Sequence, residues 1–143
     1  MVAHLVNGVK RFGWLVALGM ISACSPPPSV TPEAAKALTW LESQVQSDGS
    51  LTNENASIAT PYQARTEALG TLALVDRIPS GLADSVEADT DDSTEWVARR
   101  ALSLAAARRD VMPLINTLLT RQNTDGGFGG AVGYESNPLD TAW

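Results

Sequence analysis

The sequence has almost none of the residues that form covalent cross-links or soft metal sites. Among its 143 residues there is one cysteine, Cys24, and one histidine, His4. A lone cysteine cannot form an intrachain disulfide, and beyond Cys24 the chain has neither a thiol nor an imidazole. A disulfide framework is therefore excluded, and so is a Cys/His metal centre beyond Cys24. We predict no metal site and no cofactor.

Basic residues are also scarce, and they are unevenly placed. All sixteen acidic residues follow Cys24, whereas Lys10 and Arg11 precede it. From Cys24 onward the chain has eight basic residues against sixteen acidic ones, a net charge of −8. Such an acidic body repels phosphate backbones, and no basic cluster with interleaved aromatic residues is present. We predict that it does not bind nucleic acid.

The N-terminal segment, up to Cys24, has the pattern of a bacterial export signal. Lys10 and Arg11 precede a nearly apolar stretch, residues 12–23. A stretch of this length is too short to cross a bilayer as a helix, which takes roughly 20 residues, but it suits the apolar region of a signal peptide. The run Ile21-Ser22-Ala23-Cys24 resembles the lipobox of bacterial lipoproteins.

This resemblance implies that residues 1–23 are cleaved and that Cys24 carries a diacylglycerol on its sulfur. Residues 24–31 then form a tether, which the prolines at 26–28 keep extended and stiff. The protein would be extracytoplasmic and lipid-anchored, at the outer membrane where the cell has one, because Ser25 and not an aspartate follows the cysteine. An ordinary secretory signal and a buried N-terminal helix are the alternatives.

Residues 32–143 carry helix signals and no strand alternation. Thr31 before Pro32 and Thr60 before Pro61 are typical helix starts. Apolar residues recur at helical spacing through residues 34–45, 64–75, 97–105 and 111–119. The predicted class is therefore all-α. Asn137-Pro138 begins a further helix, and we interpret the sequence as the N-terminal part of a longer protein.

Two stretches of the sequence match in a single register, which sets position 34 against position 111. The matching sets are Ala34, Ala37, Leu38 and Leu41 with Val111, Leu114, Ile115 and Leu118; Asp48-Gly49 with Asp125-Gly126; and Thr60-Pro61 with Asn137-Pro138. A helix face, a turn and the next helix start in one register predict an internal repeat. Such units bury their apolar faces only against neighbouring units.

The last turn resembles a known repeat. The run from Gln122 through Asp125 and Gly126 to Phe128 is similar to the Gln-x-x-x-Gly-x-Trp repeat of squalene-hopene cyclases and of the prenyltransferase/squalene-oxidase family, with Phe128 in the tryptophan place. The earlier copy is degenerate, with Gln44 or Gln46 before Asp48-Gly49 and Leu51 in the aromatic place.

The resemblance implies an α/α toroid over residues 32–143, in which outer and inner helices alternate around a central cavity. The helices that end at Asp48 and Asp125 would be outer, and those that open at Pro61, Glu95 and Pro138 would be inner. The sequence holds fewer helix pairs than a complete toroid. We expect Trp40 and Trp96, at helical positions, to be packing anchors.

An acidic run suggests one catalytic alternative. Asp89-Thr90-Asp91-Asp92 resembles the Asp-x-Asp-Asp motif of class II terpene cyclases, in which the middle acid, here Asp91, would stay protonated between Asp89 and Asp92 and protonate a substrate. Alternatively, these acids form a solvated run before a helix, where the helix dipole favours negative charge. Ser93-Thr94-Glu95 follows where cyclases have Thr-Ala, which favours the solvated run.

Together these patterns predict a membrane-tethered, extracytoplasmic helical-repeat body that binds or scaffolds a protein, glycan or apolar ligand. The alternative is a cell-envelope enzyme on the same fold, either terpene-cyclase-like through Asp91 or polysaccharide-processing. The residues expected to matter are Cys24 for lipid attachment and, for the repeat, Asp48, Gly49, Gln122, Asp125, Gly126 and Phe128.

Overall fold

The computed structural model describes residues 30–56 and 59–142. Over these residues the chain forms helices and turns, together with one isolated antiparallel bridge between Val45 and Leu51. The all-α class is confirmed. The predicted export signal, Cys24 and most of the tether lie outside the described residues.

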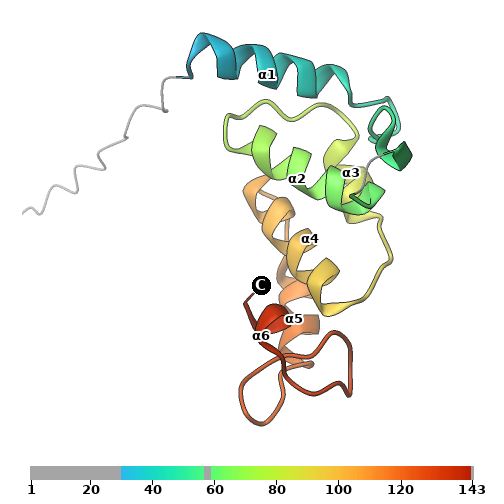
Figure 1. The fold of residues 1–143 in the computed structure, drawn as a ribbon, viewed down its shortest axis with the longest axis vertical. Coiled ribbons are helices and arrows are strands. Elements are labelled where there is room, and N and C mark those ends of the chain that lie inside the picture. The colour runs from blue at the N-terminus through green and yellow to red at the C-terminus, as the bar shows by residue number, and fades with distance from the viewer. Residues whose placement is uncertain (1–29, 57–58, 143) are drawn as a thin grey trace, which may run out of the picture.

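The helices follow one another along the long axis of the molecule, from α1 at one end to α6 and its neighbouring loops at the other (Figure 1). In chain order the elements are α1 (Pro32–Ser43), the 3-10 helix η1 (Glu54–Ala56), α2 (Pro61–Ala73), α3 (Leu82–Glu87), α4 (Thr94–Ala106), α5 (Met112–Leu119) and α6 (Pro138–Thr141). The side chains of Thr31, Thr60 and Asn137 accept the N-cap hydrogen bonds of α1, α2 and α6, each before a proline. The helix starts at these positions are as predicted.

One helix lies where the sequence indicated only a break and a polar run. Gly81, at φ 87°, precedes the short α3, and Leu82 and Val86 of α3 are fully buried. A helix this short, with so few apolar residues, does not build up a periodic pattern. The prediction therefore missed α3.

The hydrophobic core lies where α1, α2, α3 and α4 meet. α2 packs against α4, α1 packs on α2, α3 packs on both α2 and α4, and α5 packs on α4. The buried core residues are Leu38, Ala68, Leu69, Leu72, Leu82, Ala83, Val86 and Leu104. Each fully buried leucine contributes roughly 1.5–3 kcal/mol to folding.

α1 is less buried than its apolar spacing predicted. Leu38 is its only buried residue in the described chain, while Ala34 and Ala37 are exposed. α1 also ends at Ser43, because Val45 turns away to pair with Leu51. Trp40 is 64% exposed, so the expectation that it anchors the packing is wrong.

A single arginine ties the end of α2 back to α1. Asp76 adopts a left-handed conformation at φ 58°, and the N–H of Arg77 donates to the carbonyl oxygen of Leu72 at 3.0 Å. The Arg77 guanidinium then binds both carboxylate oxygens of Glu42 and donates to the Thr39 hydroxyl at 3.1 Å. This turn and ion pair hold α1 and α2 together as a pair.

The end of α4 is tied back to α3 in the same way. Arg108 is left-handed at φ 60°, and the N–H of Arg109 donates to the carbonyl oxygen of Leu104 at 2.9 Å. The Arg109 guanidinium pairs with Asp84 at 2.5 Å and with Glu87 at 3.3 Å, both on α3. Thus α3 and α4 form a second pair, closed by the same combination of turn and arginine.

A third ion pair fixes the segment between α1 and α2. The carboxylate of Glu54 on η1 binds the Arg65 guanidinium, with 2.9 Å between Nε and Oε2, and accepts the N–H of Leu51 at 2.8 Å. The Glu54 side chain is only 7% exposed. The hydrogen bonds from Arg65, aided by the bond from Leu51, hold the pKa of Glu54 below its usual value.

This lowered pKa predicts a loss of stability in acid. Because the pKa of Glu54 is lower in the folded chain than in the unfolded one, its stabilisation is present above the unfolded pKa and is lost as the pH falls through the folded one, from about pH 5 downward. Urea unfolding at several pH values should show a steeper acid loss for the wild type than for Glu54→Gln. At pH 7 this variant should be less stable by about 2 kcal/mol. Parallel pH profiles for the two chains would contradict this account, and Glu33→Gln at an exposed position is the control.

Candidate functional site

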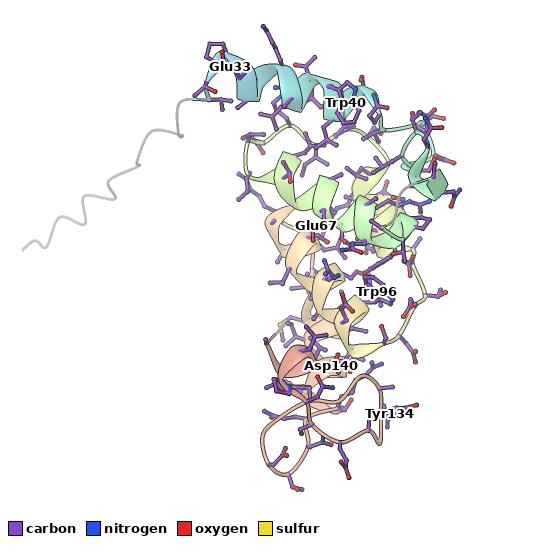
Figure 2. The ribbon with its side chains drawn as sticks, in the orientation of Figure 1. Glu33, Trp40, Glu67, Trp96, Tyr134 and Asp140 are labelled. Atoms are coloured by element: carbon purple, nitrogen blue, oxygen red, sulfur yellow. The ribbon has the colours of Figure 1, made fainter. Side chains whose placement is uncertain are left out.

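A groove of about 400 Å³ separates α2 from α4 on the side away from the core. It is lined by Thr66, Glu67, Gly70, Thr71 and Leu74 of α2 and by Arg99, Leu102, Ser103 and Ala106 of α4. On α2, positions 67, 70, 71 and 74 follow helical spacing and lie opposite the buried Leu69 and Leu72. Glu67 marks this groove where α2 faces α4 (Figure 2).

A glycine in the middle of α2 widens this groove. A Cβ atom placed at Gly70 would meet no atom within 4 Å, so the packing within the chain does not require a glycine. In a helix interior, glycine costs about 1 kcal/mol relative to alanine. The exposed Leu74, at 79%, and the exposed Leu102 also line the groove. The groove is therefore apolar, with an open space at its glycine.

Two hydroxyl groups in the groove are already bound to their own helices. Thr66 Oγ1 donates to the carbonyl oxygen of Tyr62 or of Gln63, each at 3.1 Å, and Ser103 Oγ donates to that of Arg100 at 3.3 Å. Neither hydroxyl therefore adds a free donor to the groove, and the exposed Thr71 is the remaining hydroxyl residue of its lining.

Charge in the groove is concentrated at Arg99. Its guanidinium pairs with Glu67 of α2 at 2.6 Å and with Glu95 one turn earlier on α4 at 2.8 Å, and its side chain is only 9% exposed. It also lies 5.6 Å from the centre of the Trp96 ring, within range of a cation–π contact. Two carboxylates neutralise this arginine, so Glu67, which is exposed, gives the groove an anionic edge.

An aromatic pair joins α2 to α4 near their N-terminal ends. The rings of Tyr62 and Trp96 meet edge-to-face with 4.9 Å between centroids, and the Tyr62 hydroxyl donates to the Trp96 carbonyl oxygen at 2.8 Å. Burial raises the pKa of Tyr62, so the hydroxyl stays protonated as a donor. Trp96 thus packs as the sequence predicted, and the pair has a structural role.

The acidic run lies in the connection between α3 and α4. Asp89 Oδ1 accepts the N–H of Asp91 at 2.8 Å, and Asp91 Oδ1 accepts the N–H of Ser93 at 3.0 Å. Asp91 and Asp92 are exposed. A carboxylic acid that protonates an alkene needs an apolar enclosure, whereas these carboxylates serve as turn acceptors before α4.

Two arginines fix the backbone of this run. Arg100 of α4 donates to the carbonyl oxygen of Asp89, and Arg121 donates to that of Asp92. The Arg121 guanidinium also lies 3.9 Å from the Asp92 carboxylate. Both guanidinium groups therefore hold the loop mainly through its carbonyls, while Asp91 remains exposed.

The turn after α1 has a defined set of hydrogen bonds. The N–H of Gln46 donates to the Ser50 carbonyl oxygen at 2.8 Å, and the N–H of Gly49 donates to the Gln46 carbonyl oxygen at 3.0 Å. Asp48 Oδ1 accepts the N–H of Ser50 at 3.0 Å. Gly49 has φ 82°. The hydrogen bonds from the Ser50 hydroxyl and amide lower the pKa of Asp48.

The same bonds recur at the corresponding positions of the turn after α5. The N–H of Asn123 donates to the Gly127 carbonyl oxygen at 2.9 Å, and the N–H of Gly126 donates to the Asn123 carbonyl oxygen at 2.9 Å. Asp125 Oδ1 accepts the N–H of Gly127 at 2.9 Å, and Gly126 has φ 86°. The N-caps of the helices that follow also correspond. The Thr60 side chain accepts the N–H of residue 63, and the Asn137 side chain accepts the N–H of residue 140. The two turns predicted to match therefore share one hydrogen-bonding geometry.

The glutamine of the predicted motif is present in only one of these turns. Gln122 Nε2 donates to the Gly126 carbonyl oxygen at 2.9 Å. In the first turn Val45 stands at the corresponding position, and the Gly49 carbonyl oxygen accepts a hydrogen bond from Ser85 Oγ of α3 at 3.0 Å. Neither Gln44 nor Gln46 takes this place, so that part of the prediction is wrong. The bond that replaces it comes from an element that the sequence prediction missed.

Sequence reasoning also missed the groove itself. The available signal was Gly70, a glycine inside a strong helical pattern, where the missing side chain leaves space on the helix surface. The groove could not be predicted because it depends on α4 lying beside α2. That arrangement follows from packing across the whole core.

The described residues contain no helix long and apolar enough to cross a membrane and no group of acidic, histidine or cysteine side chains that could hold a metal ion. No protein-family model, no curated protein and no solved structure matches this chain. The lipoprotein and toroid resemblances therefore stay predictions, as does the alternative for Asp91.

Replacing the glycine of each turn by alanine should reduce stability by different amounts in the two turns. A Cβ at Gly49 would overlap the carbonyl oxygen of Gly81, whereas one at Gly126 would meet nothing within 4 Å. Both glycines are left-handed, which costs an alanine about 1–2 kcal/mol. Chemical denaturation should show that Gly126→Ala lowers the free energy of unfolding by about 1–2 kcal/mol. Gly49→Ala should lower it by at least about 3 kcal/mol, because its Cβ also clashes with the backbone. Equal losses would contradict the packing of Gly49 against Gly81.

Proposed function

We propose that this protein is a lipid-anchored, extracytoplasmic helical-repeat body that binds a partner protein through the groove between α2 and α4. The anchor is supported by the sequence alone. Lys10 and Arg11, the apolar residues 12–23 and the lipobox-like run ending at Cys24 stand in the order of a lipoprotein signal.

The repeat part of the proposal rests on features that occur twice. Arg77 closes the pair of α1 and α2, and Arg109 closes the pair of α3 and α4. The turns at Asp48 and Asp125 share their hydrogen bonds in the same register as the sequence match. In the proposed arrangement α2 and α4 are neighbouring inner helices, and α1, α3 and α5 form the outer layer.

One observation carries the binding function, namely the unfilled space at Gly70 in an apolar groove. A glycine inside a helix costs about 1 kcal/mol relative to alanine, and its missing side chain leaves room for a close approach by another molecule. A partner helix fits this space, because its side chains or backbone can enter between α2 and α4. The anionic edge at Glu67 favours a partner helix with a basic residue beside its apolar face, since Arg99 is already neutralised by two carboxylates. No described contact of Asp91 favours the enzymatic alternative.

The anchor can be tested by intact mass measurement on the full-length chain produced in a bacterium. We expect a mature protein that begins at Cys24 and carries the mass of a diacylglycerol, recovered in the membrane fraction. Cys24→Ser should keep its signal residues and lack the lipid, whereas Ser25→Ala should be modified like the wild type. A wild-type chain recovered with an unmodified N-terminus would end the anchoring proposal.

The groove can be tested with variants at Gly70. Gly70→Ala should raise the free energy of unfolding by about 1 kcal/mol, because alanine is the better helix former and its Cβ has room. Gly70→Leu, which fills the space, should weaken binding of a synthetic helical peptide of alanine, leucine and lysine by about tenfold, a difference of about 1.4 kcal/mol. Fluorescence anisotropy with the labelled peptide measures this.

Two controls make the peptide experiment specific. Ala105→Leu introduces the same side chain at an exposed position of α4 outside the groove and should leave the affinity unchanged. A peptide with glutamate in place of lysine should bind more weakly than the lysine peptide, and Glu67→Gln should reduce that difference. The proposal fails if Gly70→Leu binds the lysine peptide as well as the wild type does.

A further inference from the structure

The glycine-rich segment between α5 and α6 borders a second pocket, which is open to solvent and has a volume of about 580 Å³. Its polar and aromatic lining residues are Gln122, Asn123, Thr124, Asp125, Tyr134, Glu135 and Ser136. Tyr134 marks this segment at the end of the molecule far from α1 (Figure 2). The volume falls within the range of about 300–1,000 Å³ that is usual for small-molecule sites. It shares no lining residue with the groove between α2 and α4.

The walls of this loop pocket are held together closely. Asn123 Nδ2 donates to the Tyr134 carbonyl oxygen at 3.1 Å and to Ser136 Oγ at 2.9 Å, which joins the two sides of the loop. A Cβ at Gly129 would lie 2.5 Å from the Tyr134 carbonyl oxygen, and one at Gly127 would lie 2.6 Å from the Cβ of Ser136. Gly129 therefore lets the backbone at Tyr134 approach closely, and Gly127 lets the Ser136 side chain do so, which holds the two sides of the loop together.

The loop is also fastened to the helical body. Thr94, the buried first residue of α4, donates its N–H to the Gly130 carbonyl oxygen at 2.9 Å and its hydroxyl to that of Gly129 at 2.6 Å. At the other end, the N–H of Asn137 donates to the Phe128 carbonyl oxygen at 2.9 Å. The pocket thus has a fixed position on α4 and α6.

The charges in the loop pocket exclude anionic ligands. Asp125 Oδ1 accepts from the Gly127 N–H at 2.9 Å and from Ser136 Oγ at 2.8 Å, and these bonds lower the pKa of Asp125. The carboxylate is therefore ionised at neutral pH, and Glu135 adds a second carboxyl group. No lysine or arginine is among the described lining residues. A phosphate or a uronic acid would meet repulsion without a compensating cation.

The donors, acceptors and ring in the loop pocket suit one kind of ligand. The Tyr134 residue is 67% exposed, so an aromatic surface is available beside the polar groups. Carboxylates accept two hydrogen bonds from neighbouring hydroxyls, and the amide of Gln122 has a second N–H besides the one bound to Gly126. A pyranose presents adjacent hydroxyls at its edge and an apolar C–H face that can pack on an aromatic ring.

We propose that this loop pocket is a binding site for a neutral carbohydrate, with the sugar face on Tyr134 and its hydroxyls at Asp125, Glu135 and Gln122. Sugars with equatorial hydroxyls fit best, because they are flat on both faces. The pocket is separate from the groove between α2 and α4, so the proposal does not depend on the partner protein.

The site can be located by titrating the isotopically labelled full-length chain in detergent with cellotriose and chitotriose, with trigalacturonate as the anionic comparison. Amide chemical shifts should change within residues 122–136 for the neutral trisaccharides and not for the anionic one. Tyr134→Ala should lower the affinity about tenfold. Trp40→Ala, which removes an exposed aromatic ring on α1, should leave the affinity unchanged.

The internal repeat supplies a matched control for the carboxylate. Asp48 and Asp125 accept the corresponding N–H in their two turns at 3.0 and 2.9 Å, so Asp48→Asn and Asp125→Asn should change stability similarly. Only Asp125→Asn should weaken sugar binding, by about tenfold. The proposal is overturned if neither neutral trisaccharide shifts residues 122–136, if the shifts map to the groove between α2 and α4, or if Asp48→Asn weakens binding as much as Asp125→Asn.

Discussion

The contact between α2 and α4 sets the positions of α1, η1, α3 and α5, because each of these elements packs on one or both of the two helices. Each of these two helices has one face buried in the core and another that points away from the core. Burial of the first face fixes the position of the second. α1 and α3 cover the buried side through Leu69, Leu72 and Leu104. The opposite side stays open as the groove, whose position therefore follows from the same packing that holds the chain together. The repeated arginine and turn contacts act mostly between neighbouring segments, in keeping with an array in which each unit is secured by the next.

The sequence predicted well those parts of the fold that depend on local chemistry. Thr31, Thr60 and Asn137 cap helices because a side-chain oxygen reaches a nearby backbone N–H further along the chain, which requires nothing from the rest of the molecule. The turn at Asp125 was predictable for the same reason, since Gln122 and Gly126 are neighbours in sequence. The all-α class follows from these starts and the spacing between them.

The failures share a different cause, which is dependence on distant residues. Ser85 binds the Gly49 carbonyl oxygen from α3, so a glutamine in the first turn is not needed, and no inspection of residues 44–51 reveals this. Trp40 lies on a face of α1 that no described helix covers. The loop pocket likewise depends on Thr94 fastening two glycines that are far away in the sequence, a contact with no trace in local patterns. The candidate sites were therefore less predictable than the helices that support them.

α5 has a consequence for how firmly the far end of the molecule is held. None of its side chains, all within the described part of the chain, is fully buried, although its residues are mostly apolar. Few buried contacts imply a low free energy of local opening, and resistance to opening should therefore decline from α2 towards α6. The glycine-rich loop begins where α5 ends, so transient melting of α5 would release one attachment of the loop while Thr94 retained another. A ligand held there would spend part of its binding free energy on suppressing that melting, and would stiffen a helix that it never touches.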